Sequence, residues 1–326
     1  MSEKKLALIL GATGGFGHEV ASALLRRGWR IRAVNRNPET AAARCHFPAG
    51  SVEWRKGDAL NEAEIIAAAE GASIIVHAAN PPLYRNWPGL VMPMLRNTIE
   101  AARHSGARIV LPGSIYNFPV DGPHLLKEDT PQEAPSRKGK IRIEVETALR
   151  EAQKDGVKSL VLRAGDFFGP NVTANSWISA VVKPGRPIPS IADPGRRGVG
   201  HAWAYLPDMA ETVVQLIEQE DRLGLHEVFH FGGHWLEDDC EIIRAIQRAA
   251  GPSRVKIRRF PWWAVGLASP FVPLMRELWE MRYLWKVPFK LDNAKLTTFL
   301  GKEPHTPLEE AVRISLTGLG CLPKAD

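Results

Sequence analysis

The sequence has little cysteine. Its three cysteines, Cys45, Cys240 and Cys321, lie far apart and form no CxxC pair. This spacing argues against a disulfide framework and against a thiolate zinc site. A chain with so few cysteines fits a reducing compartment, so we expect a cytoplasmic protein.

Long hydrophobic runs are also missing. The longest apolar stretch, Phe260 to Met275, contains three prolines and is shorter than the roughly 20 residues that a membrane span needs. Near the N-terminus, the apolar run Leu6 to Leu10 leads directly into glycines and is too short for the core of a signal peptide. We therefore expect no transmembrane helix and no export signal.

Neither charge nor composition is extreme. The 326 residues are 44% hydrophobic and 24% charged, and 42 basic against 36 acidic residues give a net charge of +6. This is an ordinary globular mixture, which excludes disordered and fibrous classes. A mild basic excess suits an anionic ligand as well as a nucleic-acid surface, so the sign of the charge does not choose between them.

The first 165 residues alternate between short apolar strands and amphipathic helices. Predicted strands cover Leu6–Leu10, Arg30–Val34, Val52–Arg55, Ser73–His77, Arg108–Leu111 and Ser159–Leu162, and predicted helices cover Gly17–Arg27, Glu62–Glu70, Leu90–His104 and Arg142–Lys154. This βαβ series predicts a parallel sheet covered on both faces, with ligands beyond the carboxyl ends of its strands.

After residue 165 the pattern changes to long connections rich in proline and glycine. A strand near His226–Phe231 and helices at Pro207–Gln219, Glu237–Ala250 and Pro304–Leu316 are predicted there. We therefore predict an α/β protein: a Rossmann-type doubly wound parallel sheet over residues 1–165, completed by later strands, and mainly a smaller C-terminal substrate lobe over residues 166–326.

The strongest motif follows the first strand. It is the loop Gly11-Ala12-Thr13-Gly14-Gly15-Phe16-Gly17, which leads directly into a helix. Glycines allow a tight turn and close approach of the backbone, and the helix N-terminus offers free N–H groups to a pyrophosphate. We therefore expect Gly11, Thr13, Gly14, Gly15, Phe16 and Gly17 to bind a dinucleotide.

Asn35 and Arg36 end the second predicted strand. NAD-binding sites usually place an acidic residue there, whereas an arginine suits the 2′-phosphate of NADP. With Arg32 also close in sequence, we favour NADP(H) and keep NAD(H) as the alternative. Asp58 and Ala59 follow the third strand, where Asp58 could accept a hydrogen bond from the adenine amino group or cap the next helix.

Together these segments resemble the extended short-chain dehydrogenases/reductases, the NAD-dependent epimerase/dehydratase family. The resemblance also includes His77-Ala78-Ala79-Asn80, Ser114, the segment Arg163 to Pro170, and Tyr205-Leu206-Pro207-Asp208. It implies that Ala78, Ala79 and Asn80 line the cofactor channel, that Ser114 bonds the reacting oxygen, and that the segment around Phe168 covers the nicotinamide.

The chain departs from this family at the catalytic motif. Active members use a tyrosine as general acid/base, with a lysine four residues later that lowers its pKa. No YxxxK motif occurs here, because Tyr84, Tyr116, Tyr205 and Tyr283 precede Pro88, Val120, Met209 and Val287 at that spacing. Lys138 takes the place of the tyrosine and Arg142 that of the lysine.

Another group must therefore move the proton if the protein is an enzyme. We expect Ser114 with Tyr116 or Tyr84 to act in catalysis, while Arg142 binds a ribose hydroxyl or a phosphate. Lys138 or Lys140 could serve if burial lowered its pKa. A reaction whose proton comes from water or from the substrate is a further option.

Two other patterns have plainer explanations. His226, His230 and His234 recur every fourth residue, but they fall on a strand and a turn, so we expect no metal site. Arg254 to Arg259, followed by tryptophans, could bind a membrane or nucleic acid. Its alternation indicates an edge strand instead, and we expect the tryptophans to lie in the core.

We favour an enzyme over a binding protein. It would be an NAD(P)-binding, epimerase/dehydratase-like oxidoreductase or reductase with an unusual proton donor, acting on a carbonyl or hydroxyl compound such as a nucleotide sugar or a small ring compound. The alternative is a non-catalytic NADP(H)-binding regulator that senses redox state. We expect a small-molecule substrate, no nucleic acid and no membrane as partners, and we leave a homodimer open.

Overall fold

The computed structural model describes residues 5–81, 86–172, 176–238, 240–251 and 255–323. Its main feature is a seven-stranded sheet in which every pair of neighbours is parallel. In spatial order the strands are β11 (His226–His230), β7 (Ser159–Ala164), β5 (Arg108–Ser114), β4 (Ala72–His77), β1 (Leu6–Leu10), β2 (Arg30–Asn35) and β3 (Val52–Lys56). The predicted doubly wound Rossmann-type sheet is confirmed.

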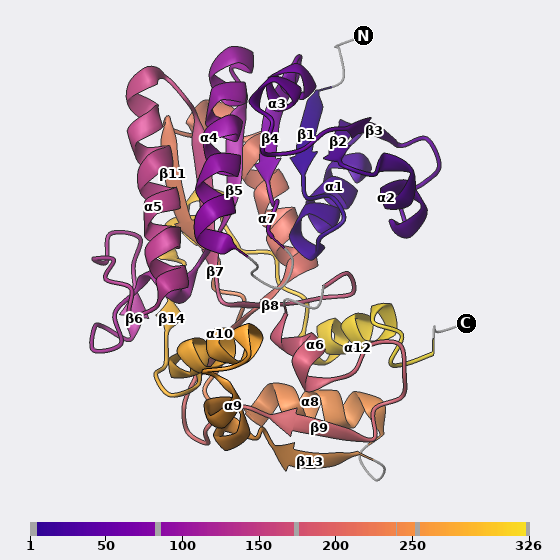
Figure 1. Ribbon diagram of the computed structural model, residues 1–326, viewed down its shortest axis with the longest axis vertical. Helices are drawn as coiled ribbons and strands as arrows, with labels where there is room; N and C mark the ends of the chain where they lie inside the picture. Colours follow the sequence, from indigo (N-terminus) through magenta and orange to yellow (C-terminus); the bar gives the residue numbers. More distant parts are fainter. Residues whose placement is uncertain (1–4, 82–85, 173–175, 239, 252–254, 324–326) are drawn as a thin grey trace.

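Helices cover both faces of this sheet (Figure 1). One face carries α3 (Glu62–Ala69), α4 (Trp87–Ser105) and α5 (Arg137–Ala152), and the other carries α1 (Gly15–Arg26) and α7 (Leu206–Glu218). The short α2 (Pro38–Arg44) joins β2 to β3. Central strands such as β1 and β7 are buried along their whole length, which explains their continuous apolar sequences.

Strand order reverses between β1 and β4, which lie side by side although α1 and α3 cover opposite faces. In such sheets ligands bind beyond the carboxyl ends of the strands at this switch point. The ends of β1, β4 and β5 point toward the second part of the molecule in Figure 1.

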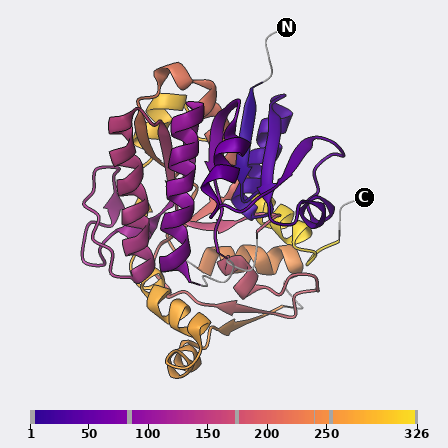
Figure 2. The same ribbon diagram turned by 45° about the horizontal axis from the view of Figure 1, so that its top comes forward.

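The second part contains a three-stranded sheet of β8 (Asp166–Phe168), β10 (His201–Tyr205) and β12 (His234–Leu236). Around it lie the pair β9 (Ser190–Asp193) and β13 (Lys256–Arg259) and the helices α6 (Trp177–Val181), α8 (Cys240–Ala250), α9 (Trp262–Ala268), α10 (Pro273–Met281) and α12 (Leu308–Gly318). Trp203, Trp285 and Ile191 belong to its own apolar core. Figure 2 shows this part beneath the sheet domain.

The chain crosses between the two parts more than once. β11 forms one edge of the large sheet, and α7 packs against α1. α11 (Ala294–Leu300) contacts β11, and two-residue strands β6 (Leu125–Leu126) and β14 (Lys290–Leu291) pair beside it. The predicted boundary at residue 165 therefore assigns six of the seven sheet strands to the first part. The seventh strand, β11, comes from the C-terminal half of the chain.

The predicted edge strand before the tryptophans is confirmed as β13, which pairs only with β9. Among the residues that the structure describes, no helix is long and apolar enough to cross a membrane. The same residues contain no group of three or more His, Cys, Asp or Glu side chains that could hold a metal ion.

Candidate functional site

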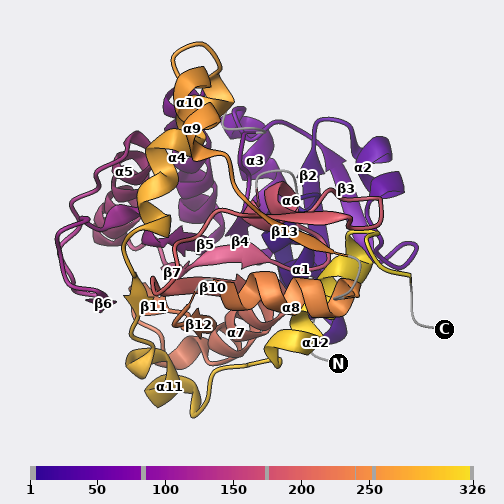
Figure 3. The same cartoon turned by 90° about the horizontal axis from the view of Figure 1, so that it is seen from below.

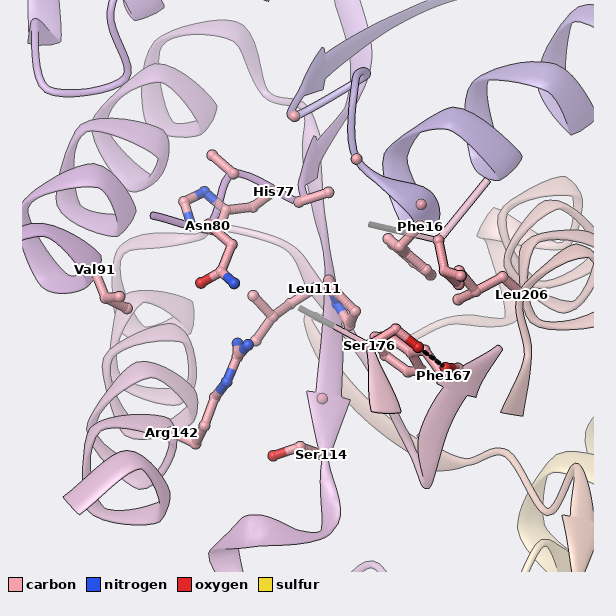
Figure 4. Close-up of a pocket in the computed structure, with 18 of the residues that line it drawn as sticks. Phe16, His77, Asn80, Val91, Leu111, Ser114, Arg142, Phe167, Ser176 and Leu206 are labelled. Atoms are coloured by element: carbon pink, nitrogen blue, oxygen red, sulfur yellow. Dashed lines mark hydrogen bonds between the residues drawn. The ribbon is translucent and has the colours of Figure 1, made fainter. Parts of the chain in front are cut away.

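A cavity of about 590 Å³ lies between the carboxyl ends of β1, β4 and β5 and the second part of the molecule. Figure 4 shows its walls, with His77, Asn80 and Val91 on one side and Phe16 and Leu206 on the other. Arg142 and Ser114 lie at one end. A single cavity thus joins the glycine turn to the residues expected to act in catalysis.

The glycine turn has the geometry of a dinucleotide cradle. Gly11 has a φ of +97°, and a Cβ there would lie 2.5 Å from the carbonyl oxygen of Ala78, so the turn and β4 approach too closely for a side chain. A Cβ on Gly17 would collide with the carbonyl of Gly11. Both glycines are therefore required by the fold itself.

Gly14 differs from these two glycines. A Cβ on Gly14 would meet one atom within 4 Å, the carbonyl oxygen of Gly11 at 3.3 Å, and Gly14 lines the cavity. It also stands at the N-cap of α1, where backbone N–H groups and the helix dipole favour an anion. These residues fit the pyrophosphate of a nicotinamide dinucleotide.

Most of the predicted cofactor residues line the cavity. They are Gly11, Thr13, Gly14, Gly15, Phe16, Arg36, Ala78, Ala79, Asn80, Ser114 and Arg142. Gly17 lies behind the turn, and Arg44 of α2 joins Arg36 in the cavity wall. Neither composition nor motif had singled out Arg44, because it lies in a helix that the sequence analysis did not predict.

Asn35, Asp58 and Ala59 lie near this end of the sheet but outside the cavity wall. The side chain of Asn35 accepts a hydrogen bond from the backbone N–H of Asn37, and Asp58 accepts one from Leu60. Asn61, not Asp58, caps α3. The contact of Asp58 with an adenine ring therefore stays a prediction.

Two sequence-based expectations are wrong. Arg32 is buried, and its guanidinium pairs with Glu53 and donates to the carbonyls of Ala68 and Glu70, so it is bound to the end of α3 and does not reach the cavity. Phe168 is fully buried in the second part. Its ring packs on Trp203 and Tyr205.

Alternation along β8 explains the second error. Successive residues of a strand point to opposite faces, so Phe167 lines the cavity while Phe168 faces the core. Ser176, at the start of α6, donates a hydrogen bond of 2.6 Å to the carbonyl of Phe167, which Figure 4 marks with a dashed line. Of these two phenylalanines, Phe167 is therefore the one that faces the cavity.

The residue in place of the family tyrosine does not line the cavity. Lys138 is buried in the first turn of α5, with Nζ 3.3 Å from a carboxylate oxygen of Glu277 on α10. Burial lowers the pKa of this lysine, and the carboxylate of Glu277 opposes that shift. Lys138 thus fastens α10 to α5, and Lys140 is exposed.

Arg142 lies one turn further along α5 and points into the cavity (Figure 4). Its guanidinium lies 5.1 Å from the centre of the Trp87 ring, and Trp87 in turn donates a hydrogen bond of 2.7 Å to Asn80. Burial, with the positive charge of Arg142 nearby, lowers the pKa of His77 to about 4, so His77 is neutral at pH 7.

Tyr116 lines the cavity from the 3-10 turn η2 (Ile115–Asn117) that follows β5. α5 packs directly on this turn, because a Cβ on Gly139 would collide with the carbonyl of Tyr116. Ser114 lines the cavity beside it, and its Oγ accepts a hydrogen bond of 3.4 Å from the N–H of Tyr116. Tyr84 lies outside the described residues.

The hydroxyl of Tyr116 belongs to a buried polar chain. It donates to Oδ1 of Asp166 over 3.2 Å, and Oδ2 of Asp166 lies 2.9 Å from Nε2 of His201. Asp166 also lines the cavity, whereas His201 is buried with its ring stacked on Trp285.

The sequence analysis assigned no role to Asp166, although its position just beyond β7 is a signal for such residues. His201 gave no local signal. It reaches the site only because β10 pairs with β8, a contact between segments distant in sequence.

The three histidines that recur every fourth residue in the sequence each have a different partner in the structure. His226 bonds Ser159, and His230 contacts Arg163 and the carbonyl of Leu126. His234 instead lies against His305.

Comparisons with known proteins agree with this geometry. Residues 11–167 match the family model described as NAD(P)H-binding. A 3-diazoavenalumate denitrifying reductase from Streptomyces sp is 26% identical over 238 residues, which cover 67% of this chain and 74% of that protein. Cinnamoyl-CoA reductase 1 from Oryza sativa subsp. japonica is 30% identical over 139 residues, covering 39% of this chain and 40% of that protein.

Among solved structures, the UDP-glucuronic acid 4-epimerase from Bacillus cereus in complex with UDP-glucuronic acid and NAD has a TM-score of 0.72. It is 15% identical, and the match covers 96% of this chain and 98% of that one. This likeness confirms the fold that the sequence motifs indicated. Residues 11–167 thus match a family model of NAD(P)H-binding domains, and the chain as a whole has the fold of this epimerase.

Proposed function

We propose that the protein is an NAD(P)H-dependent reductase in which Tyr116, connected to Asp166 and His201, takes the role of the missing YxxxK tyrosine. The observation that carries this proposal is the chain of hydrogen bonds from the cavity to His201. Tyr116 and Asp166 both line the cavity that the glycine turn also lines, which supports a role of this phenol in the reaction.

The residues divide the work as follows. A reduced cofactor held at the glycine turn by its pyrophosphate would supply a hydride to the carbon of a carbonyl group. Ser114 orients the carbonyl oxygen, and Tyr116 donates the proton that this oxygen needs. The reduction then consumes one hydride and one proton.

Asp166 and His201 restore the phenol. Oδ1 of Asp166 accepts the hydrogen bond of the phenol, and Oδ2 lies 2.9 Å from Nε2 of His201, which holds the carboxyl group in place. After Tyr116 has given its proton to the substrate, Oδ1 of Asp166 takes up a proton from water in the cavity and passes it to the phenolate oxygen across the same contact. Arg142 holds a ribose hydroxyl or a phosphate, since its guanidinium stays protonated.

The side chains that line the cavity suit an apolar substrate better than a nucleotide sugar. The lining includes the apolar side chains of Trp87, Val91, Phe167 and Trp177. The described lining residues include three arginines. We assign Arg142 to a ribose hydroxyl or a phosphate of the cofactor, and Arg36 and Arg44, which follow β2 in sequence, to its adenosine part. Both curated relatives are named as reductases. We therefore propose a carbonyl or related group attached to an aromatic or other small ring.

Arg36 and Arg44 also support a preference for NADP(H). Two guanidinium groups near the end of β2 would pair with the 2′-phosphate, and no acidic side chain among the described lining residues of that end competes for the ribose. NAD(H) remains the alternative cofactor.

The test is turnover with a panel of aromatic aldehydes, ketones and thioesters, with UDP-sugars as a second panel. Loss of the reduced-nicotinamide absorbance should require an aromatic carbonyl substrate. Tyr116→Phe should lower kcat about 100-fold or more, and Asp166→Asn should lower kcat and displace its pH profile. Tyr205→Phe is the control, because Tyr205 is a buried phenol that does not line the cavity.

Two results would contradict the proposal. Full turnover in Tyr116→Phe would show that another group supplies the proton. Tight cofactor binding with no turnover on either panel would favour the non-catalytic regulator. The structural argument for a regulator is that Lys138, which replaces the family tyrosine, is paired with Glu277 and does not line the cavity.

A further inference from the structure

An unusual surface is formed by α9 and α10, which make a hairpin that projects from the second part of the molecule (Figure 3). Five large apolar side chains are exposed on it, among them Trp263, Leu267 and Phe271 at 73%, 70% and 84%. Val272 and Leu274 complete the group. We call these five residues the apolar tip.

The apolar tip lies in a stretch without charge. Residues 260–275 contain no Asp, Glu, Lys, Arg or His. Exposed apolar residues scattered singly need no explanation, but a contiguous patch of this kind marks an interaction site. Exposed aromatic side chains such as Trp263 and Phe271 are favoured at the boundary between an apolar layer and water.

Basic residues flank the tip on both sides. Between residues 256 and 286 the chain has six basic residues, Lys256, Arg258, Arg259, Arg276, Arg282 and Lys286, and two acidic ones, Glu277 and Glu280. Lys256, Arg258, Arg259 and Arg276 are exposed. The two acids are both engaged by α5, because Glu277 and Glu280 pair with Arg137 and Glu277 also pairs with Lys138.

The hairpin is held firmly in this position. The ion pairs from α10 to the start of α5 fix one helix, and Trp262 of α9 packs against Trp177, whose ring also contacts Trp285. The apolar tip is thus carried by a hairpin whose position is fixed by these contacts. One of the contacting residues, Trp177, also lines the cavity.

We propose that the apolar tip inserts into the surface of an anionic lipid bilayer, with the flanking basic residues on the headgroups. The helix α9, with seven residues, is about 10 Å long and cannot span the bilayer. Apolar side chains of interfacial elements reach a depth of roughly 5–10 Å. Anionic lipids attract basic residues beside an apolar insertion. This departs from our sequence-based expectation of no membrane partner.

A second copy of the chain is a poorer occupant. A symmetric dimer places the same patch on both subunits against itself, so the basic residues around one tip would face those around the other. The acidic residues of the segment are bound to α5 and offer no compensation. Charge therefore favours an anionic surface.

The test is flotation of the purified protein with vesicles of phosphatidylcholine, with or without phosphatidylglycerol. Binding should require phosphatidylglycerol and weaken as salt screens the charges. Phe271→Asp with Leu267→Asp should lower the partition coefficient at least about tenfold, since burial of one such side chain is worth that much. Arg258→Gln and Arg276→Gln should each lower it about fivefold.

Leu60→Asp is the matched control, because Leu60 is an exposed leucine on the nucleotide-binding part. All variants should keep wild-type Tm and cofactor affinity, which separates surface effects from misfolding. Vesicle binding that is unchanged by the tip variants, or absent in the wild type, would overturn the proposal. So would a wild-type dimer that Phe271→Asp dissociates, because the tip would then be an interface between copies.

Discussion

Lys138 and Glu277 form an ion pair of 3.3 Å that joins α5 to α10. Because this pair holds Lys138 outside the cavity, the lysine in place of the family tyrosine is structural, while Arg142 one turn later lines the cavity. Lys138 thus joins two helices, whereas Arg142 can reach a ligand in the cavity.

These roles predict different consequences of substitution. Arg142→Met should raise the Kd for the cofactor about 10- to 100-fold, because a charge-assisted hydrogen bond is lost, with little change in Tm. Lys138→Met should instead lower the free energy of unfolding by about 1 to 2 kcal/mol, since Glu277 loses one cationic partner and keeps its ion pair with Arg137, and should leave the cofactor Kd unchanged. Calorimetry and urea unfolding measure the two quantities. Equal cofactor affinity in wild type and Arg142→Met would contradict the assignment.

Two glycines of the turn also predict different consequences of substitution, one for cofactor binding and one for folding. Gly14→Val should fold, since a Cβ at Gly14 approaches only the carbonyl oxygen of Gly11, yet it should abolish dinucleotide binding by blocking the pyrophosphate. Gly17→Val should fail to fold, because its Cβ collides with the backbone of Gly11. Circular dichroism and calorimetry of the two proteins distinguish the cases. A folded Gly14→Val protein that binds like wild type would show that the anion lies elsewhere.

Cofactor preference can be assigned to particular arginines. Arg36→Ala should reduce the affinity for NADPH about 10-fold or more and leave that for NADH nearly unchanged, because only NADPH carries the 2′-phosphate. Arg44→Ala should have a smaller effect of the same kind. Arg32→Met is the control, since Arg32 binds the end of α3; it should lower Tm without altering the ratio of the two Kd values. An unaltered ratio in Arg36→Ala would argue against this choice of cofactor.

Local sequence patterns predicted much of the nucleotide-binding part. The strands β1 to β5 and β7 were predicted within a few residues, because continuous apolar runs and glycine turns depend on short-range chemistry. Side-chain direction was harder to predict. Phe168 lies one residue from the correct assignment, because alternation puts Phe167 in the cavity wall instead. Arg32 lies in the middle of β2, where its side chain binds the end of α3.

Long-range contacts account for the rest. His201 joins Asp166 only through the pairing of β10 with β8, and the exposure of Trp263 depends on where α9 and α10 project. Tryptophans at helical spacing were expected in the core. Trp285 is there, whereas Trp263 is largely exposed, and no spacing rule distinguishes the two.

Buried histidines predict how stability depends on pH. Burial lowers the pKa values of His18, His77 and His234 to about 4 and that of His230 to about 3. In the unfolded chain a histidine has a pKa near 6.5. Because the unfolded state binds these protons first, stability is fully present above about pH 6.5 and falls as pH drops toward 4.

His77→Gln isolates one member of this group. Each such histidine adds about 1.4 kcal/mol per pH unit to the slope of unfolding free energy between those limits. The slope for cofactor-free His77→Gln, from urea unfolding at a series of pH values, should be shallower than that of wild type by about this amount. His104→Gln is the control, because His104 is exposed at the end of α4. Parallel slopes in wild type and His77→Gln would mean that His77 binds a proton in the folded state as readily as in the unfolded chain, and that the positive charge of Arg142 is held away from its ring.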